Sequence, residues 1–130
     1  MANLSMMLAV AAGGAIGAVA RYMASLVAGT GLFGIAGPLA TLSVNIAGSL
    51  MMGLFAGWVA TAGPISELWR GFLAVGCLGA LTTFSSFALD AGMLLQKQGL
   101  LAAGGYVLLS VGLSLLAFGV GFWLLRQGGA

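Results

Sequence analysis

Charge is the property this sequence has least of. Only 5% of its 130 residues are charged, whereas a soluble domain carries about 25%. The charged side chains are Arg21, Glu67, Arg70, Asp90, Lys97 and Arg126. Because 62% of the residues are hydrophobic, the sequence predicts an integral membrane protein lying in a lipid bilayer. A net charge of +2 forms no basic patch, so nucleic acid is excluded as a partner.

Side chains that bind metals or form cross-links are also scarce. Histidine is absent and Cys77 is the single cysteine. One thiol cannot form an intrachain disulfide, and a zinc or iron–sulfur site would lack its ligands. No basic segment precedes the first apolar run, so we expect a retained first helix rather than a secretory signal peptide.

Four hydrophobic segments are each long enough to cross a bilayer, whose core takes about 20 residues of helix. They cover approximately residues 4–27, 39–61, 69–95 and 101–125. Turn-forming residues separate them: Pro38 ends the first connection, Pro64 lies in the second, and the sequence QKQG forms the third. Since the connections are short, the helices must run up and down. The chain 1–130 is therefore predicted to be one four-helix transmembrane domain.

Positive charge is balanced between the two predicted sides of the membrane. An even number of spans places both termini and the 62–68 loop on one side, together with Arg70 and Arg126. Lys97 and Arg21 belong to the other side. Membrane proteins are oriented by an excess of Lys and Arg on the cytoplasmic side, so this balance favours insertion in both orientations. The alternative is that Arg21 lies too deep to count, which would leave a weak bias.

Glycine is abundant, with 23 residues. Gly13 and Gly17 are four residues apart, and Gly105, Gly112 and Gly119 repeat every seven. Small residues at such spacings let membrane helices approach closely. Four thin helices leave little interior in which to bury polar side chains, so we expect a homo-oligomer.

One polar stripe runs through the second span. Thr41, Asn45 and Ser49 are spaced by four and therefore share a helix face. For Thr41 and Ser49 the favoured role is hydrogen bonding between helices. Asn45 stays open between that role and donation of an amide hydrogen bond in an ion pathway.

A second stripe, Tyr106, Ser110 and Ser114, lies on the fourth span with the same spacing. The spacing suits a track along which an ion passes between hydroxyls. Serine hydroxyls in membrane helices also bond back to their own backbone, and this alternative remains open.

The segment GALTTFSSF interrupts the apolar character of the third span. It combines Gly79 with the hydroxyls of Thr82, Thr83, Ser85 and Ser86. Glycine and clustered hydroxyls favour a helix broken within the membrane, where irregular backbone is tolerated only if it is buried or lines a cavity. Such a break frees carbonyls for a cation and N–H groups for an anion.

Three further side chains follow in the same span. Phe84 and Phe87 are three apart, so they either pack against a neighbour or turn their electropositive ring edges to an anion path. Asp90 is expected near the end of this helix. It either pairs with Arg21 or Lys97 or, as a lone carboxylate, carries protons.

The motifs GCLGALTTFSSF, VNIAGS, GAVARY and YVLLSVGLS together resemble the Fluc (CrcB-type) fluoride channel family. The resemblance extends over nearly the whole chain and its four-span layout. It implies an antiparallel, dual-topology homodimer that is not an enzyme. The dimer would hold two fluoride pores lined by both subunits and export fluoride passively across the plasma membrane, which is the inner membrane of a Gram-negative cell.

The resemblance also implies residue roles. Phe84 and Phe87 match the phenylalanines whose ring edges face fluoride, and Asn45 matches the pore asparagine. The other residues expected along the pore are Tyr106, Ser110, Ser114, Ser85, Ser86, Thr41 and, near its mouth, Arg21. The backbone carbonyls of Gly79 and Thr82 match those that hold a structural sodium ion on the dimer axis.

This chain departs from the family pattern at three positions. Ser86 stands where threonine is usual, Ala88 where serine is frequent, and Asp90 where glutamate is common. Two other classes remain as alternatives. A small dual-topology, proton-coupled exporter of the multidrug type would use Asp90 as its proton carrier, and a non-transporting assembly subunit would be held together by its glycine faces.

Overall fold

The computed structural model describes residues 3–29 and 36–128, and within these ranges every regular element is helical. The first, second and fourth spans are α1 (Leu4–Gly29), α2 (Ala36–Ala62) and α6 (Leu100–Gln127). The third span comprises α3 (Glu67–Arg70), the π-helix η1 (Gly71–Leu78), α4 (Gly79–Leu81) and α5 (Phe84–Gln98). Each span is long and apolar enough to cross a membrane, which confirms the prediction of an all-α protein with four membrane helices.

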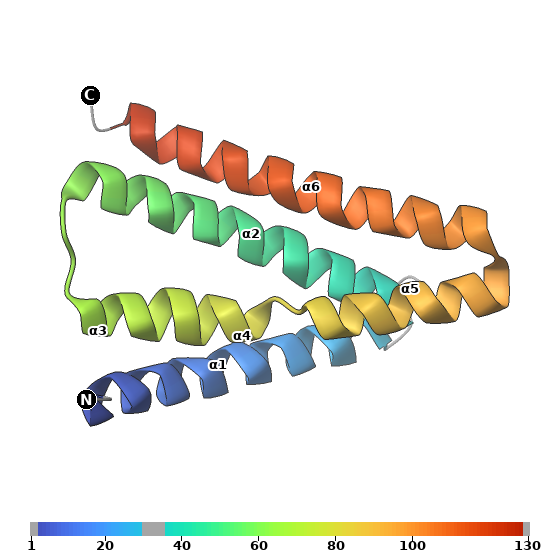
Figure 1. Ribbon diagram of the computed structural model, residues 1–130, viewed down its shortest axis with the longest axis horizontal. Helices are drawn as coiled ribbons and strands as arrows, with labels where there is room; N and C mark the ends of the chain where they lie inside the picture. Colours follow the sequence, from blue (N-terminus) through green and yellow to red (C-terminus); the bar gives the residue numbers. More distant parts are fainter. Residues whose placement is uncertain (1–2, 30–35, 129–130) are drawn as a thin grey trace.

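The four spans lie side by side in an up-and-down order (Figure 1). The start of α1, the end of α6 and the connection between α2 and α3 are at the same end. Lys97, near the end of α5, lies at the opposite end. Arg70 and Arg126 belong to the first end, whereas Arg21 lies within α1, beside Thr83 of the third span.

The helix boundaries differ slightly from the predicted ones, and proline and glycine explain two of the differences. α2 begins at Ala36 rather than 39, since Pro38 sits in the first turn, where the N–H that proline lacks would have no helical partner. The rest of that predicted connection, residues 30–35, lies outside the described residues. α5 continues to Gln98 and ends at Gly99, whose φ of 93° is left-handed and whose N–H donates to the carbonyls of Leu94 and Leu95.

The third span bends near its middle. α4 ends at Leu81, and the next two residues are extended, Thr82 with φ −78° and ψ 153° and Thr83 with φ −150° and ψ 124°. α5 then starts at Phe84 and continues toward the other end of the bundle (Figure 1). The bend lies beside the middle of α2, so the polar segment GALTTFSSF is placed between helices.

Glycine lets two pairs of helices touch backbone to backbone. A Cβ atom at Gly13 or Gly17 of α1 would overlap carbonyl oxygens of η1, and one at Gly53 of α2 would overlap the Phe118 carbonyl of α6. A Cβ at Gly112 or Gly119 would have no atom within 4 Å among the described residues. The sequence repeats therefore serve two purposes, because some glycines pack this chain and others face outward.

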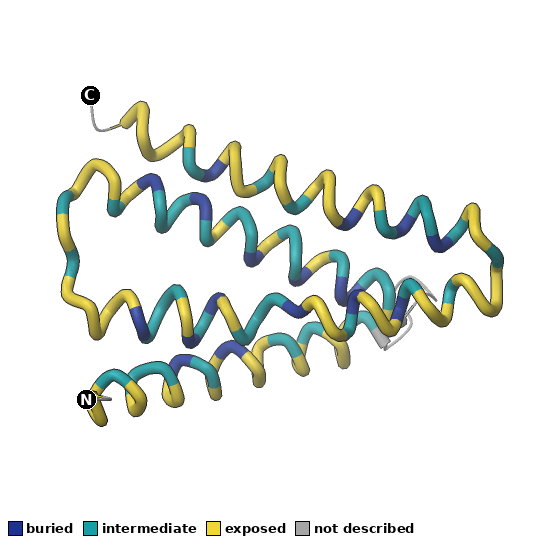
Figure 2. Tube along the Cα trace, viewed as in Figure 1, coloured by how far each residue is buried: buried dark blue, intermediate teal, exposed yellow. Residues whose placement is uncertain are grey.

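The buried residues form a small, partly polar core (Figure 2). Its apolar members are Ala40, Val44, Leu78, Phe87, Ala103 and Tyr106. Its polar and charged members are Thr41, Thr83, Asp90 and Ser110. Most large apolar side chains point outward, as expected where lipid is the solvent. Because polar groups are costly at membrane depth, these buried polar side chains mark a candidate functional region.

Candidate functional site

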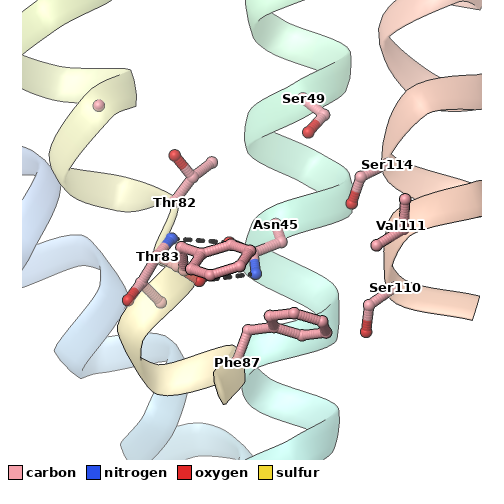
Figure 3. Close-up of a pocket in the computed structure, with 10 residues that line it drawn as sticks. Asn45, Ser49, Thr82, Thr83, Phe87, Ser110, Val111 and Ser114 are labelled. Carbon is pink, nitrogen blue, oxygen red and sulfur yellow. Dashed lines mark hydrogen bonds between the residues drawn. The ribbon is translucent and has the colours of Figure 1, made fainter. Parts of the chain in front are cut away.

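A cavity of about 380 Å³ opens between α2, the bend and α6 (Figure 3). It is lined by Asn45, Ser49, Gly79, Thr82, Thr83, Phe84, Phe87, Ser110, Val111 and Ser114. The structure thus brings together residues from three spans that the sequence assigns to a pore or a cation site. We call this space the bend cavity.

A second cavity of about 230 Å³ lies on the α1 side of the bend. It is lined by Ala18, Arg21, Tyr22, Ser25, Ala40, Thr41, Val44, Thr83 and Ser86. Arg21 is the one charged side chain among the described residues that line either cavity. A lone cation in a confined space attracts anions, so we call this the arginine cavity. Thr83 lines both cavities and separates them.

Asn45 is paired with the backbone of the bend. Its Nδ2 donates to the Thr83 carbonyl at 3.0 Å, and the Thr83 N–H donates to its Oδ1 at 2.7 Å (Figure 3). These bonds join residues 38 positions apart in the sequence. They supply partners for two backbone groups that the bend removes from the helical ladder, as buried backbone groups require.

Thr83 is a residue that the sequence reasoning missed as a site residue. Its side chain is the N-cap of α5, with Oγ1 accepting from the Ser86 N–H at 3.2 Å. The same oxygen lies 3.2 Å from Ser85 Oγ and donates to Ser86 Oγ at 3.3 Å. Threonine is one of the favoured N-cap residues of a helix. Its place directly before the apolar and hydroxyl residues that start α5 could have identified Thr83 as the cap. The predicted pore residues Ser85 and Ser86 therefore take part in the hydrogen bonds of this N-cap.

Ser110 and Ser114 carry the least expected feature of the site. Their hydroxyl oxygens are buried, and neither makes a hydrogen bond of ordinary geometry to a described residue, although that of Ser110 interacts with the Tyr106 hydroxyl. Ser110 is only 4% exposed. Other hydroxyls in the chain do bond the backbone of their own helix. Ser43 donates to the Leu39 carbonyl at 2.7 Å, and Thr61 donates to the Trp58 carbonyl at 3.0 Å. A buried hydroxyl without a partner costs about 1–3 kcal/mol, so these two hydroxyls are candidates to bond an occupant of the bend cavity.

The two phenylalanines have different surroundings. Their ring centroids are 5.3 Å apart, but Phe87 is 9% exposed and Phe84 is 78% exposed. Phe87 also lies against the ring of Tyr106, with centroids 5.6 Å apart. Phe87 therefore belongs to the core of the chain, whereas Phe84 forms the outer edge of the bend cavity.

Tyr106 and Asp90 form a buried pair that the sequence did not predict. The Tyr106 hydroxyl donates to Asp90 Oδ2 at 3.3 Å, and Asp90 is 9% exposed. Within the described ranges the carboxylate meets this hydroxyl rather than Arg21 or Lys97. Asp90 is thereby placed at one end of the hydroxyl stripe of α6. Its spacing of sixteen residues from Tyr106 gives no sign of the contact in the sequence, because the contact depends on how α5 packs against α6.

The fold and the site together define a small multi-pass membrane protein with two polar cavities between its helices, one of which contains Arg21. The chain belongs to the family described as "CrcB-like protein, Camphor Resistance (CrcB)", whose model matches residues 8–122.

Curated relatives are similar over almost their whole length. A "Fluoride-specific ion channel FluC" of Caulobacter sp. (strain K31) is 42% identical over 125 residues, which cover 95% of this chain and 97% of the relative. A protein of the same name from Rhodospirillum centenum is 46% identical over 123 residues, with the same coverage. Another from Vibrio cholerae serotype O1 (strain ATCC 39541) is 42% identical over 119 residues, covering 91% of this chain and 94% of the relative.

Proposed function

We propose that this protein is a fluoride-selective ion channel, not an enzyme, that exports fluoride passively across the plasma membrane. Its membership of the CrcB-like family and the names of its relatives support the proposal. The structural observation that carries it is the pair of buried hydroxyls, Ser110 and Ser114, in a cavity walled by phenylalanine rings. Four membrane spans fit a multi-pass protein of the plasma membrane, which in a Gram-negative cell is the inner membrane.

The chemistry of fluoride fits the donors of the bend cavity. Fluoride is small and strongly hydrated, so a pore must replace its water with compact donors and yet release the ion. Hydroxyls of Ser110 and Ser114 and the amide of Asn45 are such donors, and ring edges of Phe84 and Phe87 carry weak positive charge. Chloride is larger and gains less from the same donors. A narrow path built of them therefore favours fluoride.

The arginine cavity fits the role of an entrance. Arg21 attracts anions there, and Thr41 and Ser86 add hydroxyls beside it. The Tyr106 hydroxyl, four residues before Ser110 and bonded to Asp90, extends the track along α6. Hydrogen fluoride that enters a cell from acidic surroundings dissociates inside, and we propose that the anion leaves along this path down its electrochemical gradient.

The proposed channel is an antiparallel homodimer. Three features of the single chain support a second copy: the bend cavity is open, Phe84 at its edge is exposed, and the hydroxyls of α6 line only one wall. The even distribution of Arg and Lys between the two ends supports insertion in both orientations. A second copy would close the cavity and provide the missing wall.

A sodium ion at the dimer axis is the proposed cofactor. In a continuous helix the Thr83 N–H would donate to the Gly79 carbonyl. Here the Thr83 N–H donates to Asn45 instead, so the Gly79 carbonyl lacks that donor. Thr82 is extended, and both residues line the bend cavity. Among the described residues there is no cluster of His, Cys, Asp or Glu for a metal, whereas backbone carbonyls suit a hard cation. Two carbonyls from each copy fit the ion, whose positive charge would hold the copies together.

One set of measurements tests the assembly and the ion. We expect a dimer in detergent whose melting temperature falls by several degrees when sodium is replaced by N-methylglucamine, since a ligand stabilises the state that binds it. In proteoliposomes of Cys77→Ser/Gly128→Cys, an impermeant maleimide should label about half of the thiols. A monomer, a melting temperature independent of sodium, or complete labelling would contradict the dimer, the ion or the dual topology, respectively.

The function itself is tested by ion efflux from liposomes that hold the purified protein. We expect rapid loss of fluoride and retention of chloride when both are followed with electrodes in parallel, because the donors of the bend cavity match the smaller ion. Liposomes without protein are the control. Retained fluoride in vesicles with correctly folded dimers would refute the channel and return the exporter and the assembly subunit as explanations.

A further inference from the structure

The pairing of Asn45 with Thr83 is possible only in one backbone conformation. In an extended residue the N–H and the C=O point to the same side of the chain, so one side-chain amide can bond both. In an α-helix the two groups point along the axis in opposite directions, so one amide cannot reach both. The bonds at 3.0 and 2.7 Å (Figure 3) are therefore specific to the extended form of Thr83.

The alternative form of this segment is a continuous helix. In it the Thr83 N–H would bond the Gly79 carbonyl, and no side chain would be needed. The flanking residues already lie in helices, α4 and α5. Thr83 is only 7% exposed, and unpaired backbone is unfavourable at membrane depth. Asn45 thus decides between the two forms.

We propose that Asn45 is a positioning residue that latches the third span in its bent form through the two backbone bonds to Thr83. Phe84 follows Thr83 directly and Phe87 follows four residues later, so the latch sets where both rings lie. The pairing also fixes which end of the amide is Oδ1. Nδ2 uses one hydrogen on the Thr83 carbonyl and keeps the other, and Asn45 lines the bend cavity.

The effect of the latch on ion flux rests on the proposed function, but the hydrogen bonds do not. The test therefore reads the backbone in buffer without fluoride. The chain contains five threonines, so selective ¹³C,¹⁵N-threonine labelling resolves Thr83, and its carbon chemical shifts are read by NMR in detergent micelles. We expect shifts typical of an extended residue in the native protein.

Asn45→Ala should move the Cα and Cβ chemical shifts of Thr83 from extended toward helical values, because the continuous helix then gives the Thr83 backbone groups their partners. The shifts of Thr61, at the far end of α2, should not change. Asn45→Asp keeps the acceptor for the Thr83 N–H, so it should keep the extended shifts, and it provides the test if the alanine variant does not fold. Ser43→Ala is the matched control on α2, since Ser43 bonds its own helix at Leu39.

Extended Thr83 shifts in Asn45→Ala, or helical shifts in Asn45→Asp, would overturn the latch. If the native protein conducted no fluoride and the expected shifts still appeared, the proposed function would fail while the latch stood. Lost flux with unchanged shifts would mean that Asn45 acts only as an ion ligand.

Discussion

Phe87→Ile is expected to slow fluoride efflux at least about tenfold, which corresponds to about 1.4 kcal/mol in the barrier. The reason is that isoleucine fills much of the volume but has no electropositive edge to face an anion. Phe87 is packed between Phe84 and Tyr106, with ring centroids 5.3 and 5.6 Å away, so the same change also removes a contact with the hydroxyl stripe of α6. The initial rate from fluoride-loaded liposomes is the measurement.

Phe84→Ile separates conduction from stability. Phe84 is 78% exposed in the single chain, so its replacement should leave the folded chain as stable as before and still lower the flux. Phe55→Ile is the matched control, because Phe55 lies on α2, packs near Trp58 and lines neither cavity. Equal flux in all three variants would remove the ring-edge explanation, and equal loss in all three would assign the effect to general damage.

The membrane spans could be predicted from the sequence because lipid imposes a length and a polarity on any helix that crosses it. Their ends differed slightly, most of all near Pro38, which the first turn of α2 accommodates, and at Gly99, which caps α5. No feature of the sequence predicted that Gly71–Leu78 forms a π-helix. Its sequence reads as an ordinary apolar helix, and its carbonyls meet the glycines of α1, a contact that no local pattern encodes.

The sequence drew attention to polar side chains of the cavity but not to their connections. Spacing singled out Asn45, Ser110 and Ser114 with their roles left open, the family resemblance implied pore roles for them, and all three line one cavity. The bonds of Asn45 to the Thr83 backbone and of Tyr106 to Asp90 were not predicted. Each joins different helices, so each depends on how the helices pack. A polar residue in a membrane helix shows that it needs a partner, but its sequence does not show which partner it has.

Gly53→Ala is expected to destabilise the chain by about 2 kcal/mol or more, the usual cost of overfilling a packed contact. The added methyl would overlap the carbonyl oxygen of Phe118, a backbone atom that moves only if α2 and α6 separate. Gly121→Ala should behave alike, because its Cβ would lie 2.5 Å from the Leu50 carbonyl oxygen and 2.8 Å from the Leu54 nitrogen. Unfolding in mixed detergent micelles with increasing SDS measures the change.

Gly112→Ala is the matched control and should stabilise the chain rather than destabilise it. It lies on the same helix as Gly121, a Cβ there meets no atom within 4 Å, and alanine favours helix over glycine by up to about 1 kcal/mol. Equal destabilisation by Gly53→Ala and Gly112→Ala would show that glycine acts through helix flexibility rather than through close approach. A Gly112→Ala chain that stays folded but no longer pairs would instead place the glycine repeat of α6 at the contact between two copies.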